Sequence, residues 1–266
     1  MSIFLSSGSR SVCLRATRNI IGISHHKHTF IPSQERTASS KTETKTKTKT
    51  RAKTGTKSKS KDDSDKAVRS LGALDAGEHY DTTTYAAHAQ RTGLDTSSTV
   101  YLGTHYEYKV ASSLGDFGFD LKRVGGRGDF GIDLIGTWVI PSSRRPLRVI
   151  MQCKVAATKT MIGPRLIREL EGAFIGAPSG WRGEGVVGLL VAQKPATKGV
   201  RDSLGRSRWP MGFISCLPDG KVQQMLWNRQ AEDQGLAGLG VAIRFSEGEN
   251  NTQELILTYQ GKPSTP

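Results

Sequence analysis

The hydrophobic pattern becomes regular only near Ser98, and from there it alternates between two periods. Apolar residues recur at helical spacing over 99–114, and they alternate with polar residues over 117–121. Further strands are expected over 132–140, 147–155, 186–192, 211–217, 223–227, 241–245 and 255–259. Further helices are expected over 164–177, 197–206 and 229–236.

This order of elements predicts one mixed α/β domain over residues 98–262, with a central mixed β-sheet flanked by helices. Two features mark the helix starts. Pro164 suits the first turn of a helix because its ring fixes φ and the missing N–H needs no partner there. Thr197 suits an N-cap because its hydroxyl can accept a bond from the first turn. The run 186–192 is apolar throughout, as in a strand buried on both faces.

The first third of the chain differs in composition from the rest. A Lys–Thr repeat follows Lys41 and offers no apolar residues to bury, so residues 36–97 are expected to form a disordered low-complexity linker. Residues 1–66 hold 15 Lys and Arg against 5 Asp and Glu, which accounts for +10 of the net charge of +14. The basic balance therefore describes this segment more than the domain, and charge alone does not identify a partner.

Residues 1–35 combine Ser, Arg and apolar residues, and no carboxylate precedes Glu35. This composition is typical of a mitochondrial presequence, or transit peptide, so we expect a protein of the mitochondrial matrix. An ordinary basic N-terminus is the alternative. No stretch approaches the roughly 18 apolar residues that a membrane span requires, so no span is expected.

Polar residues of a particular kind interrupt two of the apolar strands. Asp133 stands near the start of one strand, and Gln152 and Lys154 share a face near the end of the next. If the two strands pair as a hairpin, the three side chains meet. A carboxylate and an amide oxygen suit Mg²⁺, with Mn²⁺ as an option, while an ammonium can orient water and offset charge on a phosphate. Glu107 of the first helix could reach the same ion.

A structural interpretation stays open for the same residues. Asp133 and Lys154 could form a buried salt bridge, with Gln152 completing the hydrogen bonds. Cys153, which points to the other face of the strand, is expected to pack in the core. The three cysteines lie far apart without a CxxC pair, so neither a structural zinc site nor a disulfide framework is expected.

Three features of the sequence resemble the Mrr-type branch of the restriction-endonuclease-like PD-(D/E)XK nucleases. They are Glu107 on a helix, the segment Gly126–Asp133 (GRGDFGID), and then Gln152-Cys153-Lys154. The resemblance spans roughly residues 100–205. The presequence and the later segment 227–231 (WNRQA) resemble, more specifically, a fungal mitochondrial family required for respiratory growth.

The resemblance implies a restriction-endonuclease-like core and a magnesium-dependent hydrolase. Asp133 is then the metal-binding aspartate, Lys154 the catalytic lysine and Glu107 the helix glutamate. Gln152 stands where many members of the superfamily have Glu or Asp; the Mrr-type branch accepts Gln, but one negative ligand is lost. Asp129 is a candidate neighbour of the site, and capping the turn is an equal alternative for it.

Basic residues near these strands are candidates for contact with phosphates: Arg127, Arg165, Lys198 and Arg201. Solvated surface charge is the alternative for each of them. We therefore expect a nuclease-like protein that acts on nucleic acid, with DNA favoured over RNA, and that serves mitochondrial genome maintenance or respiratory growth. A homodimer is one option for cutting both strands. The rival hypothesis is an inactive nuclease fold that binds organellar nucleic acid or a protein partner.

Overall fold

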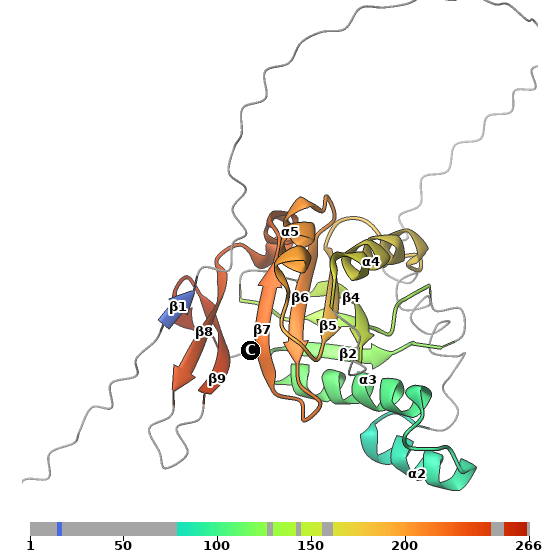
Figure 1. Ribbon diagram of the computed structural model, residues 1–266. Helices are drawn as coiled ribbons and strands as arrows, with labels where there is room; N and C mark the ends of the chain where they lie inside the picture. The colour runs from blue at the N-terminus through green and yellow to red at the C-terminus, as the bar shows by residue number, and fades with distance from the viewer. Residues whose placement is uncertain are drawn as a thin grey trace, which may run out of the picture.

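The computed structural model describes residues 15–17, 79–126, 130–141, 145–155, 162–245 and 253–264, and Figure 1 shows their arrangement. A six-stranded sheet lies at the centre. Its strands follow the order β2-β3-β4-β5-β6-β7. They are β2 (Phe119–Arg123), β3 (Leu134–Trp138), β4 (Leu147–Lys154), β5 (Val186–Ala192), β6 (Met211–Cys216) and β7 (Val222–Trp227).

The sheet is mixed, as expected. β2, β3 and β4 pair antiparallel, β4, β5 and β6 pair parallel, and β7 returns antiparallel to β6. The hairpin expected between the two strands that carry the polar residues is confirmed, with Leu134 opposite Met151. The antiparallel half needs only short connections, whereas each parallel step requires a crossover helix.

Helices cover both faces of this sheet. They are α3 (Thr99–Gly115), α4 (Pro164–Gly176) and α5 (Lys198–Arg206), followed by α6 (Arg229–Ala231) and the π-helical turn η1 (Glu232–Leu236). Thr197 caps α5 as expected, because its Oγ1 accepts from Val200 N at 3.3 Å. The helix expected over 229–236 is α-helical only at its start, since Gly235 has a φ of 134° that breaks the regular turn.

Two hydrophobic cores follow from the alternation of side chains along the strands. One core joins Val110 and Leu114 of α3 to Leu134, Val149 and Met151 on one face of the sheet. The other core places α4 and α5 against the opposite face. The sheet is therefore buried on both sides, and the polar residues at the end of β4 stand out against this apolar background.

The C-terminal strands form a separate sheet with the order β1-β8-β9-β10. Its long members are β8 (Leu239–Phe245) and β9 (Gln253–Tyr259), an antiparallel pair beside β7 in Figure 1. Leu255 and Leu257 pack into the core under α3. The short strands are β1 (Arg15–Thr17), which pairs with β8 from within the expected presequence, and β10 (Lys262–Pro263).

The folded region begins earlier than expected. Helix α2 (Thr82–Thr92) lies inside residues 36–97, which were expected to form only a linker. Asp81 caps this helix with a reciprocal bond to Thr84, and Tyr85 and Ala89 are buried. These two buried side chains, one helical turn apart, and the N-terminal cap are enough to hold a short helix against α3. Most of its side chains are small or polar, so the apolar stripe is weak in the sequence.

Within the segment 227–231, Asn228 has a structural role. Its side chain is 2% exposed and makes four hydrogen bonds. The amide oxygen accepts from Met211 N and Ala231 N, each at 3.0 Å, and the amide nitrogen donates to the carbonyls of Leu204 and Trp209. One residue thus joins the end of α5, the start of β6 and the cap of α6. A buried amide with all its bonds satisfied specifies one arrangement of these elements.

Among the described residues, no helix is both long enough and apolar enough to cross a bilayer.

Candidate functional site

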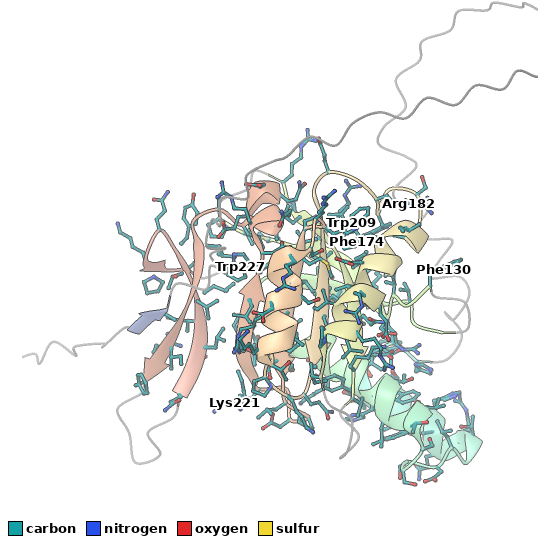
Figure 2. All side chains as sticks on the ribbon, turned by 45° about the horizontal axis from the view of Figure 1, so that its top comes forward. Phe130, Phe174, Arg182, Trp209, Lys221 and Trp227 are labelled. Carbon is teal, nitrogen blue, oxygen red and sulfur yellow. The ribbon has the colours of Figure 1, made fainter. Side chains whose placement is uncertain are left out.

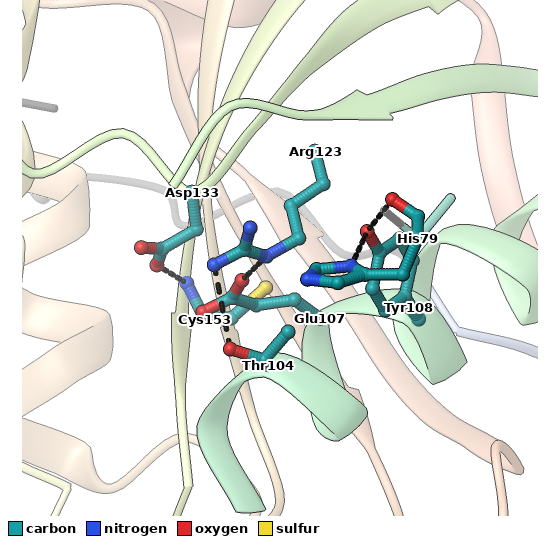
Figure 3. Close-up of polar contacts among 7 residues, drawn as sticks. All are labelled: His79, Thr104, Glu107, Tyr108, Arg123, Asp133 and Cys153. Carbon is teal, nitrogen blue, oxygen red and sulfur yellow. Dashed lines mark hydrogen bonds and ion pairs between the residues drawn. The ribbon is translucent and has the colours of Figure 1, made fainter. Parts of the chain in front are cut away.

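The predicted site residues lie at the carboxyl end of the parallel strand β4. Asp133 immediately precedes β3 and is held by two backbone bonds of that hairpin: its N–H donates to Met151 O at 2.8 Å, and its Oδ2 accepts from Cys153 N at 2.6 Å. Figure 3 shows the second of these bonds. The carboxylate is therefore fixed against the strand that carries Gln152 and Lys154. The carboxyl ends of parallel strands are where open α/β sheets bind ligands.

Glu107 joins Asp133 at this place, although it comes from α3. The two carboxylates flank Gly125, which is buried. A Cβ at this glycine would lie 3.2 Å from Glu107 Oε2 and 3.4 Å from Asp133 Oδ1. A side chain at residue 125 would crowd the Glu107 carboxylate and contact Asp133. The structure thus brings together the aspartate and the helix glutamate that the sequence singled out.

Arg123 is the residue of this site that sequence reasoning missed. Its Nε lies 2.6 Å from Glu107 Oε2, and both side chains are 12% exposed. Its Nη2 donates to Thr104 Oγ1 at 3.3 Å, and its guanidinium lies 5.9 Å from the ring centre of Tyr108 (Figure 3). A signal was present: Arg123 continues the alternation of Phe119 and Leu121, so a charge stands where an apolar residue is expected.

Gln152 is 6% exposed, and among the described residues its Oε1 has no hydrogen-bond partner. A buried amide oxygen without a partner costs about 1–3 kcal/mol, so a donor or a cation there would relieve it. Its Nε2 faces the turn before β3, where a Cβ on Gly131 would lie 3.3 Å away. Asp133 is the neighbour of Leu134, which pairs with Met151, so Asp133 and Gln152 are adjacent across the hairpin.

These donors decide which cation the site could hold. Within the described ranges, no group of three or more His, Cys, Asp and Glu is placed to bind a metal. Two carboxylates and one orphaned amide oxygen do fit Mg²⁺ or Mn²⁺, since Mg²⁺ uses few protein oxygens and keeps several waters. The ion pair with Arg123 holds one of the two carboxylates.

Lys154 has a different partner from the one that a structural salt bridge requires. Its Nζ lies 3.7 Å from Glu169 Oε2 on α4, and Arg165 Nε lies 3.2 Å from the other oxygen of the same glutamate. Asp133 is bound by the backbone of Cys153 instead. The alternative of a buried Asp133–Lys154 bridge completed by Gln152 is therefore wrong. The Lys154 side chain is 33% exposed.

Cys153 packs against the core under α3, as expected. Burial raises the pKa of its thiol well above the ordinary value, and the carboxylates of Asp133 and Glu107 raise that pKa further. The thiol is therefore kept neutral.

The candidate phosphate contacts have different surroundings. The N-termini of α4 and α5 adjoin, since a Cβ on Gly199 would lie 3.3 Å from Pro164 Cδ. Arg165 and Lys198 are exposed there and pair within their own helices, Lys198 with Asp202 at 2.7 Å. Arg201 instead donates to Ala196 O at 2.7 Å and supports the loop before α5. Arg127 and Asp129 lie outside the described residues.

Comparison with known proteins agrees with the second resemblance. The family model described as "Required for respiratory growth protein 7" matches residues 98–145 and 139–243. An uncharacterized mitochondrial protein of Schizosaccharomyces pombe is 34% identical over 157 residues, which cover 58% of this chain and 61% of that protein. "Required for respiratory growth protein 7, mitochondrial" of Saccharomyces cerevisiae is 24% identical over 169 residues, or 48% of this chain and 69% of the relative.

The match thus spans somewhat less than two thirds of the S. pombe relative. Both relatives carry mitochondrial names, which confirms the mitochondrial location expected from residues 1–35. The family match covers more than half of the sequence and includes α3, β2, β3 and β4 with Glu107, Asp133, Gln152 and Lys154. The chain belongs to the family of required for respiratory growth protein 7.

Proposed function

We propose that this protein is a metal-dependent phosphodiesterase of the PD-(D/E)XK type that acts on mitochondrial nucleic acid, with DNA as the favoured substrate. The observation that carries the proposal is the buried, unpartnered Oε1 of Gln152 beside Asp133. Buried polar atoms in proteins are usually completed by a protein group, an ordered water or an ion, and the carboxylate of Asp133 beside this oxygen favours a cation. The mixed sheet with α3 on one face and α4 and α5 on the other is compatible with a restriction-endonuclease-like core.

Asp133, Glu107 and Gln152 would hold Mg²⁺ or Mn²⁺, which supplies Lewis-acid chemistry for phosphodiester hydrolysis when bound. The protein itself contributes orientation and charge. The N–H of Cys153 fixes the carboxylate of Asp133, so this group need not reorganise. Lys154 would orient water and offset negative charge on a phosphate. Glu169 holds the Lys154 ammonium in position.

A second candidate is a nuclease fold that binds organellar nucleic acid, or a protein partner, without cleaving. Two observations favour it. Glu107 is engaged by Arg123 at 2.6 Å, and Gln152 supplies a neutral ligand where many nucleases have a carboxylate. Both reduce the negative charge available to a cation, so metal affinity decides between the two candidates.

Cleavage assays with the full chain test the proposal. Labelled duplex DNA, single-stranded DNA and RNA are incubated with Mg²⁺, with Mn²⁺ or with EDTA. The variants are Asp133→Asn and Lys154→Ala, and Lys262→Ala serves as a matched control because Lys262 is exposed on the C-terminal sheet. We expect cutting by wild type and Lys262→Ala only with a divalent ion, and a loss of at least about 100-fold in both site variants.

If wild type and the site variants all bind nucleic acid equally and none of them cuts it, the enzyme hypothesis is rejected in favour of the binding protein. Sedimentation of the same samples with and without duplex DNA tests the homodimer, because cutting both strands of a duplex often uses two copies of a site related by symmetry.

A further inference from the structure

Phe130 is exposed in a way that packing does not explain. Its side chain is 71% exposed, and its backbone has a φ of 54°. A bulky residue in the left-handed region carries strain, which persists only where the surroundings impose it and which often marks a functional segment. Phe130 packs closely against the end of α4, because a Cβ on Gly176 would lie 2.8 Å from Phe130 Cβ. The ring therefore stands on the backbone of α4 and faces solvent.

Beside this ring lies an apolar pocket with a volume of about 380 Å³. Its walls are aliphatic or ring carbons of Val124, Ile132, Ile135, Ile175 and Pro178. Ile175 is itself 71% exposed. One charged group, Arg182, stands among these walls, and its Nε donates to Ala177 O, which fixes the direction of the guanidinium. Figure 2 shows Phe130 and Arg182 on the same side of the molecule, by α4.

One turn of the chain, residues 130–133, links the pocket to the candidate site. Phe130 precedes Gly131, and a Cβ on Gly131 would lie 3.3 Å from Gln152 Nε2. Ile132, a wall residue, precedes Asp133. One short turn thus carries a pocket residue, a glycine against Gln152, a second pocket residue and the aspartate in succession. A ligand whose phosphate lies at Asp133 and Gln152 would place its neighbouring group over this pocket.

We propose that the pocket receives one unpaired nucleobase of the nucleic-acid strand, stacked on the ring of Phe130 with its polar edge toward Arg182. The inference rests on the proposed function, because the strand is positioned by the phosphate site. A base is flat and apolar on its faces and polar only at its edge, which matches apolar walls with a single cation. The volume exceeds that of one base and falls in the usual range for small-ligand pockets, about 300–1,000 Å³. An aliphatic peptide side chain would make no polar contact with the guanidinium.

The occupant also explains why the ring is exposed. Stacking on an aromatic side chain is tolerant of sequence, since every base has a π-face. An unpaired base is available in single strands, in loops and at frayed or damaged positions of a duplex. The substrate class that the pocket selects is therefore nucleic acid with at least one unpaired nucleotide next to the phosphate that the site holds.

The test measures binding with Ca²⁺ in place of Mg²⁺, so that the carboxylates of the site keep a divalent cation while cutting is suppressed. The full chain is titrated into single-stranded oligonucleotides that carry 2-aminopurine at successive positions, and anisotropy and 2-aminopurine fluorescence are read together. Wild type should quench the fluorophore at one position. Phe130→Leu keeps an apolar side chain but no ring, so affinity should fall about 5- to 150-fold and the quenching should vanish. Phe130→Tyr keeps the ring and should behave as wild type.

Two further variants make the outcome decisive. Tyr80→Ala removes an equally exposed ring, 79% exposed, away from the pocket and should change nothing. Ile175→Gln alters an exposed wall residue without threatening the fold, and it should weaken binding and quenching even if Phe130→Leu does not fold. Wild-type binding and quenching in both Phe130→Leu and Ile175→Gln would overturn the base pocket.

Parallel cleavage assays with Mg²⁺ separate the two proposals. If wild type cuts but Phe130→Leu and Ile175→Gln bind and cut normally, the base pocket fails and the enzyme stands. If nothing is cut but binding and quenching depend on Phe130, the enzyme fails and the base pocket stands. If wild type binds none of the oligonucleotides, the base pocket fails, and an apolar peptide becomes the occupant to examine. The enzyme fails as well if duplex DNA, single-stranded DNA and RNA are all left uncut.

Discussion

Glu107 of α3 and Arg123 of β2 form an ion pair with a distance of 2.6 Å between Oε2 and Nε, and each side chain is only 12% exposed. The pair links the helix that covers one face of the sheet to the first strand of that sheet. It also sets the charge of the candidate site, because Arg123 neutralises one of the two carboxylates around Gly125. The same contact therefore affects both the stability of the fold and the charge of the candidate site.

Removing Arg123 should be costly. Arg123→Met removes the guanidinium from a buried carboxylate, and we expect a loss of about 3–5 kcal/mol in the free energy of unfolding. Urea denaturation followed by circular dichroism measures this loss. Arg244→Met is the matched control, since its pair with Glu254 is 49% and 61% exposed and should contribute less than about 1 kcal/mol. Equal effects of the two variants would show that Glu107 is not confined as the structure has it.

Gln152→Glu tests whether the end of β4 attracts a cation. The new carboxylate lies beside Asp133 and Glu107, so in EDTA like-charge repulsion should lower the thermal midpoint by several degrees. Millimolar Mg²⁺ should then raise the midpoint of Gln152→Glu more than that of wild type, because a third negative ligand strengthens binding to the folded state. Differential scanning fluorimetry measures both shifts.

Gln223→Glu, at an exposed position of β7, is the control and should respond to neither condition. A Gln152→Glu protein whose midpoint ignores Mg²⁺ would argue against a metal at this site.

Much of the fold could be predicted because the hydrophobic pattern of its strands differs from that of its helices. The apolar run of β5 occurs at its predicted residues, 186–192, since a strand between two helical layers has no polar face. Thr197 and Pro164 marked helix starts by local chemistry. Helix α2 was missed because its buried positions, Tyr85 and Ala89, are too few to stand out after a polar repeat.

The site could be predicted only where strand parity applies. Gln152 and Lys154 share a strand and Asp133 faces them across a hairpin, so their proximity follows from pairing. Arg123 and Glu169 pair with site residues from other elements, and such contacts depend on how a helix packs on a sheet. Sequence spacing carries no information on that distance. The pocket at Phe130 arises in the same way, from the end of α4 meeting a turn.

Two glycines make a matched pair for testing the sheet. A Cβ on Gly136 of β3 would lie 1.9 Å from Asp120 O, which is backbone of the paired strand β2 and cannot yield. Gly136→Ala should therefore cost about 3 kcal/mol or more in the free energy of unfolding. Gly103, inside α3, has open space around its Cβ position, and Gly103→Ala should stabilise by about 0.5–1 kcal/mol.

Urea midpoints of the two variants, measured side by side, should move in opposite directions. A Gly136→Ala protein as stable as wild type would contradict the close approach of β2 and β3.

The protein should lose stability above about pH 9. Burial raises the pKa of Cys216 to about 11 and raises the pKa of Cys153 well above the ordinary value of 9.0. At a pH between 9.0 and about 11, the Cys216 thiol releases its proton in the unfolded chain but keeps it in the folded protein. The unfolded state then binds fewer protons, so the free energy of unfolding falls as pH rises. Below the unfolded pKa both states are protonated, and the stabilising contribution of the neutral thiol is fully present.

Cys216→Ala isolates this contribution. Its side chain is fully buried, so the substitution carries a packing cost that does not depend on pH. The difference in unfolding free energy between wild type and Cys216→Ala should shrink by about 1 kcal/mol from pH 7.5 to pH 10, as the wild type loses the stability linked to its thiol. Urea titrations under reducing conditions at the two pH values measure it. A difference that stays constant would mean that the Cys216 thiol ionises as easily in the folded protein as in the unfolded chain.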